Sequence, residues 1–480
     1  NFADLTCDSD GKLNNFIDDG KIKSLLNLHK PEEDKDYLIG IFMTGAYQEA
    51  LGNLHNLFGS TNVVHIDINQ NDSYKVKNFI KEDIHRLLFE LKDPNILKTV
   101  YSNNLQEAWF EIVVELMNIS NFHVGHMVEK SATRNYNKIA FKTIKGNTVV
   151  ERTYQKFWND MIKVSESILF FEKLDKTPVV GLLTNNRYKG ILVDLACLSF
   201  GIRIIPIPLN FTSEHLNYVL EESKITHLFI GGGTANRLWN SVASKHQIDL
   251  IAFDDPEILY GNVTDWDSFF DSGNKFSISD RLNIVSMDWI ATIMYTSGTT
   301  ANPKGIPFNH INMISKRFAR AIALPDVNCD DTFLSYLPLF HTFGRFFEMM
   351  GSIFWGSTYT FAESPAFNSL LKDFQLVSPT IFISIPKRWV QLYEIIEEGI
   401  NLDKVDSNYI KQKIKESTGG KLKLGLSAAG YLDPDIFYFF QNNSVNLLSG
   451  YGMTEATGGI TMTPTNDYVK DSVGKALPGI

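Results

Sequence analysis

One short stretch, residues 292–305, constrains this chain more than any other. An apolar segment that ends at Tyr295 runs directly into a loop of hydroxyl-bearing residues and glycine, followed by a Pro-Lys-Gly sequence centred on Lys304. A loop with so little side-chain bulk lets backbone N–H groups converge on an anion, while hydroxyl groups and a lysine add donors and positive charge. The common nucleotide-triphosphatase loop differs, because there Gly-Lys precedes Ser or Thr. The stretch therefore predicts a phosphate site of another kind. The candidate phosphate-binding residues are Thr296, Ser297, Gly298, Thr299, Thr300 and Lys304.

Three stretches follow one another in the order found in a known superfamily. Residues 295–305 resemble the signature loop of adenylate-forming enzymes, which include acyl-CoA synthetases, luciferases and peptide-synthetase adenylation domains. Residues 337–341, LPLFH, resemble the histidine motif of that superfamily, and residues 449–455, SGYGMTE, resemble its adenine- and magnesium-binding segment. The resemblance implies an α/β fold, namely the large N-terminal domain of such an enzyme, with mostly parallel sheets covered by helices.

The resemblance also implies roles for individual residues. Catalytic roles fall on Lys304, His341 and Glu455. Magnesium is assigned to Thr296 and Glu455, which suits a hard cation that prefers oxygen ligands. The implied ATP site comprises Thr296, Ser297, Gly298, Thr299, Thr300, Lys304, Ala429, Gly430, Ser449, Gly450, Tyr451 and Thr454. Without the superfamily, His341 is also typical of a hydrogen-bonded core histidine, and Glu455 of a carboxylate at a helix N-terminus.

The acid that would be activated is indicated by two apolar stretches. Residues 340–355 are rich in Phe and Met with few charges, and residues 378–389 follow; both resemble the long-chain fatty acyl-CoA synthetase branch. The implied reactants are a fatty acid, ATP and CoA. Adenylation of an aryl or amino acid is an alternative, although no aspartate is apparent that would meet the ammonium group of an amino acid. A non-catalytic module that binds an acyl group or a nucleotide is a second alternative.

The chain from about residue 119 onward alternates helical and strand patterns. Helical spacing at 153–171, 188–200 and 213–222 alternates with apolar strand-like runs at 179–183, 203–208 and 226–230. Elements of these lengths in this order predict a mostly parallel sheet with helices on both faces. We therefore place one large domain at residues 119–480.

Residues 1–118 need a separate account, and we expect a small, incomplete α+β segment there. A strand-like run at 62–68 and an amphipathic helix at 82–91 are predicted. The phrases around Cys7 and Tyr47 resemble the C-terminal part of biosynthetic arginine decarboxylase. The resemblance implies that Cys7 reaches a partner's active site, Asp8 meets the basic group of the substrate and Tyr47 lies near the phosphate of pyridoxal phosphate (PLP). PLP would bind only if the decarboxylase barrel were supplied elsewhere.

Composition excludes several classes of protein. The net charge of −10 argues against nucleic acid as a partner, which requires a basic surface. Three widely spaced cysteines form neither a disulfide framework nor a metal knuckle, and a reducing cytoplasm fits them. The longest apolar run, near 190–209, contains Asp194 and Arg203, so we predict no transmembrane segment and leave peripheral membrane contact open. The chain begins without methionine and stops abruptly, so we expect a partial reading frame that lacks the superfamily's small C-terminal domain.

Overall fold

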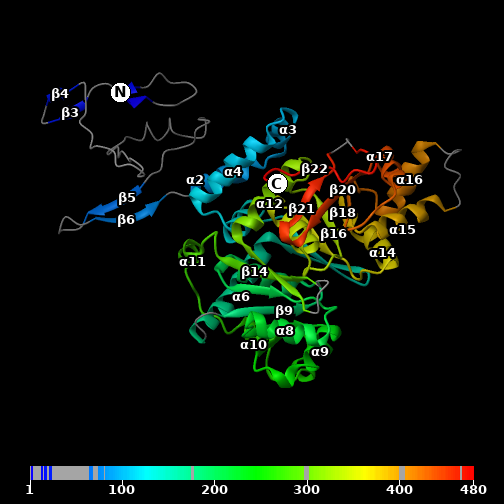
Figure 1. The fold of residues 1–480 in the computed structure, drawn as a ribbon, viewed down its shortest axis with the longest axis horizontal. Coiled ribbons are helices and arrows are strands. Elements are labelled where there is room, and N and C mark those ends of the chain that lie inside the picture. The colour runs from blue at the N-terminus through cyan, green and yellow to red at the C-terminus, as the bar shows by residue number, and fades with distance from the viewer. Residues whose placement is uncertain are drawn as a thin grey trace. The chain divides into compact units, whose positions relative to one another are not determined.

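Two β-sheets carry most of the architecture in this computed structural model (Figure 1). The described residues are 82–174, 178–296, 302–398, 406–464 and 468–480, together with six short strands nearer the N-terminus. The chain divides into two units, residues 1–84 and 85–480. In the first unit the described strands form three antiparallel pairs: β1 (Phe2–Ala3) with β2 (Lys12–Leu13), β3 (Phe16–Asp18) with β4 (Lys21–Lys23), and β5 (Val64–Ile68) with β6 (Tyr74–Phe79).

The first sheet of the larger unit has the strand order β13-β12-β11-β9-β10-β14-β15. Its strands are β9 (Val179–Thr184), β10 (Arg203–Pro206), β11 (His227–Gly231), β12 (Asp249–Ala252), β13 (Asn262–Asp265), β14 (Ile290–Thr296) and β15 (Lys304–Asn309). All neighbours are parallel except β14 and β15. Strand β11 is buried along its whole length, as expected for a parallel strand in a sheet covered on both faces.

The second sheet has the order β22-β21-β20-β19-β18-β16-β17-β7-β8. Its strands are β7 (Ile139–Lys145), β8 (Thr148–Thr153), β16 (Thr332–Ser335), β17 (Thr358–Phe361), β18 (Ile381–Ser384), β19 (Leu424–Ala428), β20 (Asn446–Met453), β21 (Gly458–Met462) and β22 (Lys475–Ala476). The strands from β7 to β20 are parallel, and β8, β21 and β22 pair antiparallel at the two ends. The carboxyl ends of β16, β18, β19 and β20 therefore lie along one edge, where loops can build a site.

Helices cover both sheets. From residue 94 onward the described helices are α3 (Pro94–Ser102), α4 (Gln106–Ser120), α5 (Val124–Arg134), α6 (Tyr154–Leu174), α7 (Tyr188–Phe200), α8 (Ser213–Ser223), α9 (Gly233–Asn240), α10 (Trp266–Phe270), α11 (Ile278–Ile284), α12 (His310–Ala323), the π-helix η3 (Phe343–Met349), α13 (Met350–Trp355), α14 (Phe367–Val377), α15 (Pro386–Glu397), α16 (Ser407–Thr418) and α17 (Pro434–Asn442), with short 3-10 turns between them. Helix α7 packs on the first sheet, α13 packs on the second, and both contact α5. Helices α8 and α9 line an apolar cluster on the first sheet, and α14–α17 line another on the second.

The sequence-based fold expectations are confirmed for the larger unit. The expected helices at 153–171, 188–200 and 213–222 correspond to α6, α7 and α8. The three expected strands between and after them correspond to β9, β10 and β11, and all three are parallel neighbours. Among the described residues, no helix combines the length and apolarity that a membrane span needs.

The predicted boundary near residue 119 lies inside the larger unit. Helix α2 (Glu82–Leu91) begins where the predicted amphipathic helix begins, and α3 and α4 both pack on α12. On α4, Trp109, Val113 and Met117 are buried, and the Trp109 ring lies 6.1 Å from the ring of Phe318. The fold therefore divides at Ile84 and His85, while the join between the two resembled sequences near 119 stays a prediction.

A buried histidine pair lies where α12 begins. The ring of His310 is fully buried, its centroid is 5.4 Å from that of His123, and neither of its nitrogens has a hydrogen-bond partner among the described residues. Burial, together with the positive charge that His123 can carry, lowers the pKa of His310 to about 3. Its imidazole is therefore neutral in the folded protein at any pH near neutrality.

We predict that His310 makes the protein sensitive to mild acid. Between pH 6.5 and about 3 the unfolded chain binds a proton at this histidine and the folded chain does not, so stability falls as pH falls. The wild-type free energy of unfolding should lose about 1.4 kcal/mol per pH unit relative to His310→Phe below pH 6. Urea denaturation of both proteins between pH 7.5 and 4.5 measures this difference. Parallel stability curves for the two proteins would contradict the assignment.

Candidate active site

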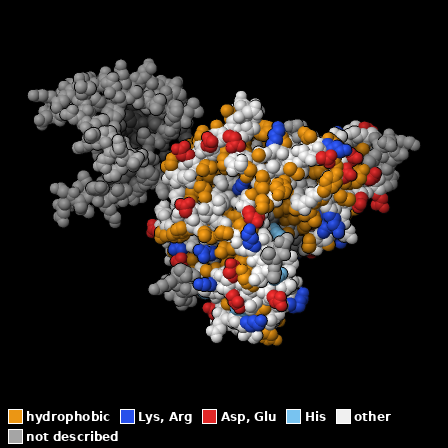
Figure 2. All heavy atoms as spheres, viewed as in Figure 1, with side chains coloured by type: hydrophobic (Ala, Val, Ile, Leu, Met, Phe, Trp, Pro, Cys, Tyr) orange, Lys and Arg blue, Asp and Glu red, His pale blue; other side chains and the backbone are white. Residues whose placement is uncertain are grey.

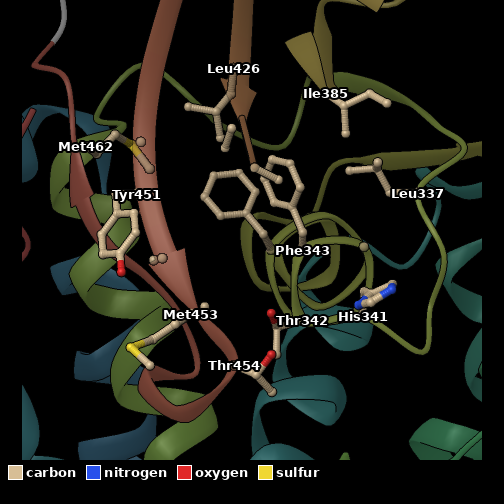
Figure 3. A pocket seen from close by; sticks show the side chains of 18 of the residues that line it. Leu337, His341, Thr342, Phe343, Ile385, Leu426, Tyr451, Met453, Thr454 and Met462 are labelled. Atoms are coloured by element: carbon tan, nitrogen blue, oxygen red, sulfur yellow. The ribbon is translucent and has the colours of Figure 1, made fainter. Parts of the chain in front are cut away.

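A cavity of about 340 Å³ opens at the carboxyl edge of the second sheet. It lies between the loop after β16, helix α12, and strands β20 and β21. In the close-up, Tyr451, Met453 and Met462 lie on one side, Leu337 and His341 on the other, and the ring of Phe343 between them (Figure 3). In the space-filling view, hydrophobic side chains border a hollow on this face, with histidine atoms at its edge (Figure 2). The cavity is thus mainly apolar, with few polar groups.

The loop that carries His341 is held in place by its own backbone and by a distant asparagine. The N–H of His341 donates to the carbonyl of Pro338 over 3.1 Å. The Asn186 side chain makes two hydrogen bonds to the same loop. It donates to the carbonyl of Leu337 over 2.7 Å and accepts from the N–H of Leu339 over 3.1 Å. Asn186 therefore positions the histidine loop, a role that the sequence did not indicate because Asn186 lies in a turn far from the motif.

Close backbone packing continues into the π-helix η3. A Cβ at Gly344 would lie 2.5 Å from the carbonyl oxygen of Pro338, so only glycine allows η3 to start against the loop. The His341 side chain is open to the cavity, yet the protein around it lowers its pKa below the ordinary value. A neutral imidazole at neutral pH can accept or donate a hydrogen bond without adding charge to the cavity.

The opposite wall includes four residues of the predicted ATP site. Ala429, Gly450, Tyr451 and Thr454 line the cavity, which places four of the predicted ATP-site residues together. Ala429 has a φ of +66°, and Gly450 lies on β20 directly beside Ala428 of β19. The predicted residues Gly430 and Ser449 are adjacent in sequence to these but do not line the cavity. Tyr451 is half exposed, so its ring is accessible to a flat ligand.

The phosphate-loop motif and the motif at residues 449–455 come together at Lys304 and Glu455. Lys304 begins β15 opposite Thr296 in the antiparallel register, and the Lys304 ammonium lies 3.8 Å from a Glu455 carboxylate oxygen. The Lys304 side chain is largely exposed and the Glu455 side chain nearly half exposed, so this pair contributes little to stability and remains accessible to a ligand. Four phosphate-loop residues that follow Thr296 lie outside the described residues, and their assignment stays a prediction: Ser297, Gly298, Thr299 and Thr300.

The donors present fit a magnesium ion that arrives with a nucleotide. Within the described part of the chain no group of three His, Cys, Asp or Glu side chains could hold a metal alone. Magnesium, however, is commonly bound through one or two protein oxygens plus substrate phosphates and water. The exposed Glu455 carboxylate beside Lys304, with Thr296 at the end of β14, matches that donor set.

A fully buried ion pair connects the cavity to the phosphate strand. Arg345 on η3 donates to both carboxylate oxygens of Asp194 on α7, over 2.8 and 2.5 Å, and to the Thr292 hydroxyl on β14 over 2.8 Å. Thr292 in turn donates to the carbonyl of Ile204 over 2.6 Å. Neither partner of the ion pair was assigned from the sequence. The signal was present, since each is a charge within an otherwise apolar segment.

The chain belongs to the AMP-binding enzyme family, whose sequence profile matches residues 128–480. Long chain acyl-CoA synthetase 7, peroxisomal, of Arabidopsis thaliana is 26% identical over 350 residues, covering 65% of this chain and 49% of that protein. The solved structure of the anthranilate CoA ligase AuaEII with anthranoyl-AMP superposes with a TM-score of 0.62 at 18% identity, covering 75% of this chain and 65% of that one. That structure confirms the α/β fold of an adenylate-forming enzyme.

The N-terminal segment matches a different protein. Biosynthetic arginine decarboxylase of Prochlorococcus marinus (strain MIT 9312) is 88% identical over 93 residues, which cover 19% of this chain and 14% of the decarboxylase. The resemblance inferred from the sequence is thereby confirmed. Cys7, Asp8 and Tyr47, to which it assigned roles, lie outside the described residues. The chain spans about half the length of the acyl-CoA synthetase and a small fraction of the decarboxylase.

We predict that loss of either Arg345 or Asp194 alone destabilises the fold far more than loss of both together. Arg345→Met or Asp194→Leu alone leaves a buried charge without its partner and should cost about 3 to 5 kcal/mol of stability. The double variant should recover most of that loss, because apolar pairs of similar volume replace buried ion pairs well. Chemical denaturation of the four proteins gives the coupling energy.

An exposed ion pair provides the control. Lys163 and Asp271 lie 3.2 Å apart with both side chains largely in solvent, so Asp271→Asn should change stability by less than about 1 kcal/mol. Additive losses in the Arg345 and Asp194 double variant would show that the two side chains do not act as a unit.

Proposed function

We propose that the chain activates a long-chain fatty acid with ATP and magnesium, forming an acyl-adenylate, from which the thiol of CoA then displaces AMP to give acyl-CoA. The meeting of Lys304 with Glu455 beside an apolar cavity carries this proposal, because it joins a phosphate-binding group and a magnesium ligand to a pocket for an alkyl chain. The relative that is named a long chain acyl-CoA synthetase supports the same class of acid.

The chemistry asks for charge neutralisation and alignment. A carboxylate oxygen of the acid attacks the α-phosphorus of ATP, the bond from that phosphorus to the bridging oxygen breaks, and pyrophosphate leaves. Both reactants are anions, so positive charge at the leaving phosphates and correct placement account for most of the acceleration. Lys304 meets the β- and γ-phosphates, and Thr296 and Glu455 hold the magnesium ion, which supplies further positive charge. Tyr451, Ala429 and Gly450 receive adenine, and the neutral His341 orients the carboxylate.

The N-terminal segment has no part in this reaction. Residues 1 to about 118 are proposed to be a piece of a PLP-dependent arginine decarboxylase, with Cys7, Asp8 and Tyr47 at its functional positions. PLP would enter only with a barrel from another chain. We also propose a cytoplasmic location. Contact with a membrane surface is proposed to occur only through the acyl substrate.

Acyl-adenylate analogues test the class of acid. In such analogues a sulfamate replaces the phosphate, so they bind without reacting. We expect the dodecanoyl analogue to bind about tenfold or more tightly than the anthraniloyl or leucyl analogue, because the apolar wall buries more of an alkyl chain. Titration calorimetry on the full chain measures all three. Tightest binding of the anthraniloyl analogue would assign an aryl acid instead.

Lys304 gives an internal control in the same experiment. Lys304→Ala should weaken ATP binding by about 1 to 3 kcal/mol, because one charge-assisted contact to the terminal phosphates is lost. The same variant should bind the dodecanoyl analogue as the wild type does, since that analogue lacks those phosphates. Lys372→Ala, on the exposed face of α14, should change neither affinity. Unchanged ATP binding by Lys304→Ala would remove the phosphate assignment.

A further inference from the structure

Arg320, on helix α12, lies at the wall of the cavity. Arg320 is 1% exposed and lines the cavity wall. Its Nη2 donates to the carbonyl of Thr457 over 2.8 Å. A Cβ at Gly458, which has a φ of +98°, would lie 2.6 Å from that nitrogen and 3.7 Å from the Thr342 side chain. The guanidinium therefore lies against the backbone where β21 begins, close to the residue after His341.

Most of the hydrogen-bonding capacity of this guanidinium is unused. Nε and Nη1 of Arg320 have no partner among the described residues, and no carboxylate there forms an ion pair with it. The guanidinium carbon of Arg320 lies 4.8 Å from the centroid of the Phe347 ring. Burial lowers the pKa of Arg320 to about 9, as expected for a cation that has lost water without gaining an anion.

Compared with Arg345, Arg320 lacks a carboxylate partner within the described chain. Arg345 is equally buried, but its donors are occupied by Asp194 and Thr292. A buried guanidinium without an anion is costly, because its desolvation is not offset by attraction to an opposite charge. A single bond to the Thr457 carbonyl uses one of five N–H donors and does not offset that cost.

We propose that Arg320 is the anion-binding residue of this cavity and that its guanidinium, whose Nε and Nη1 are buried and unpartnered among the described residues, turns toward the cavity to donate to an oxyanion of the bound acid. The inference rests on the proposed function, in which an acid occupies the cavity. Two sources share this chemistry: the carboxylate that reacts, and a second carboxylate elsewhere on the acid. The proximity of Arg320 to Thr342 fits the first source, and the apolar cavity wall around it can accommodate the second. In either case the cavity selects for an oxygen anion where a purely apolar wall would not.

The neighbouring Arg317 supplies a matched control. It lies on the same helix, it is also 1% exposed, and its three guanidinium nitrogens have no partner within the described chain. Unlike Arg320, it does not line the cavity. Replacing either arginine by methionine removes a buried charge that lacks an anion, so both variants should fold and melt at or above the wild-type temperature.

The test compares wild type, Arg320→Met, Arg320→Lys and Arg317→Met in binding decanoate, decanedioate, methyl decanoate and ATP, by calorimetry on the full chain. We expect Arg320→Met to weaken acid binding by about 10- to 100-fold while leaving the uncharged ester and ATP unaffected. Arg320→Lys should retain part of the acid affinity, and Arg317→Met should bind as the wild type does. Weakening for both acids assigns the reacting carboxylate, and weakening for decanedioate alone assigns a second carboxylate.

Two results would overturn the inference. The first is unchanged acid binding by Arg320→Met, and the second is an equal loss for the ester, which would indicate a packing role for the arginine. A lowered melting temperature of Arg320→Met with unchanged acid affinity would assign Arg320 to the support of β21 through Thr457. If the wild-type chain bound neither ATP nor either acid, the proposed function itself would fail, and this inference with it.

Discussion

The buried contact of Arg345 with Asp194 and Thr292 is the interaction on which the cavity depends. It joins three separate segments: η3, which follows the His341 loop; α7, which packs on the first sheet; and β14, which leads into the phosphate loop. A buried charge pair of this kind adds little net stability. A conformation that separates the two charges is strongly destabilised, because each charge is then buried without its partner. The spacing between the histidine loop and the phosphate strand is thereby fixed before any ligand binds.

The same physics distinguishes Arg345 from Arg320, the arginine that lines the cavity. Arg345 has an anion and acts as a fixed structural link, whereas Arg320 has one carbonyl and two unoccupied nitrogens. A protein interior tolerates few uncompensated charges, and such charges are common where a ligand completes the site. Among the described residues close to the cavity there is thus one buried arginine with its anion and one without.

The fold and part of the site followed from the sequence because their signals are local. Alternating helix and strand periods identified α6 to α8 and β9 to β11, and three short motifs identified Lys304, His341 and Glu455, of which Lys304 and Glu455 lie together. Asn186, Arg345 and Arg320 were missed because their partners lie far away in the chain, and periodicity does not encode such pairs. For Arg345 the clue was chemical, because a charge in an apolar run requires a partner. Helices α3 and α4 were assigned to the N-terminal segment, because packing onto α12 leaves no local signal.

The central claim is that one cavity, bounded by the His341 loop and strand β20, receives the acyl-adenylate. Hydrogen–deuterium exchange of the full chain with and without a dodecanoyl-sulfamoyl adenosine tests it most directly, because exchange reports protection of each backbone segment. We predict slower exchange in peptides that cover residues 336–349 and 446–462, with no change in α8 and α9 on the far face of the first sheet. Protection confined to other segments, or none at saturating analogue, would contradict the account.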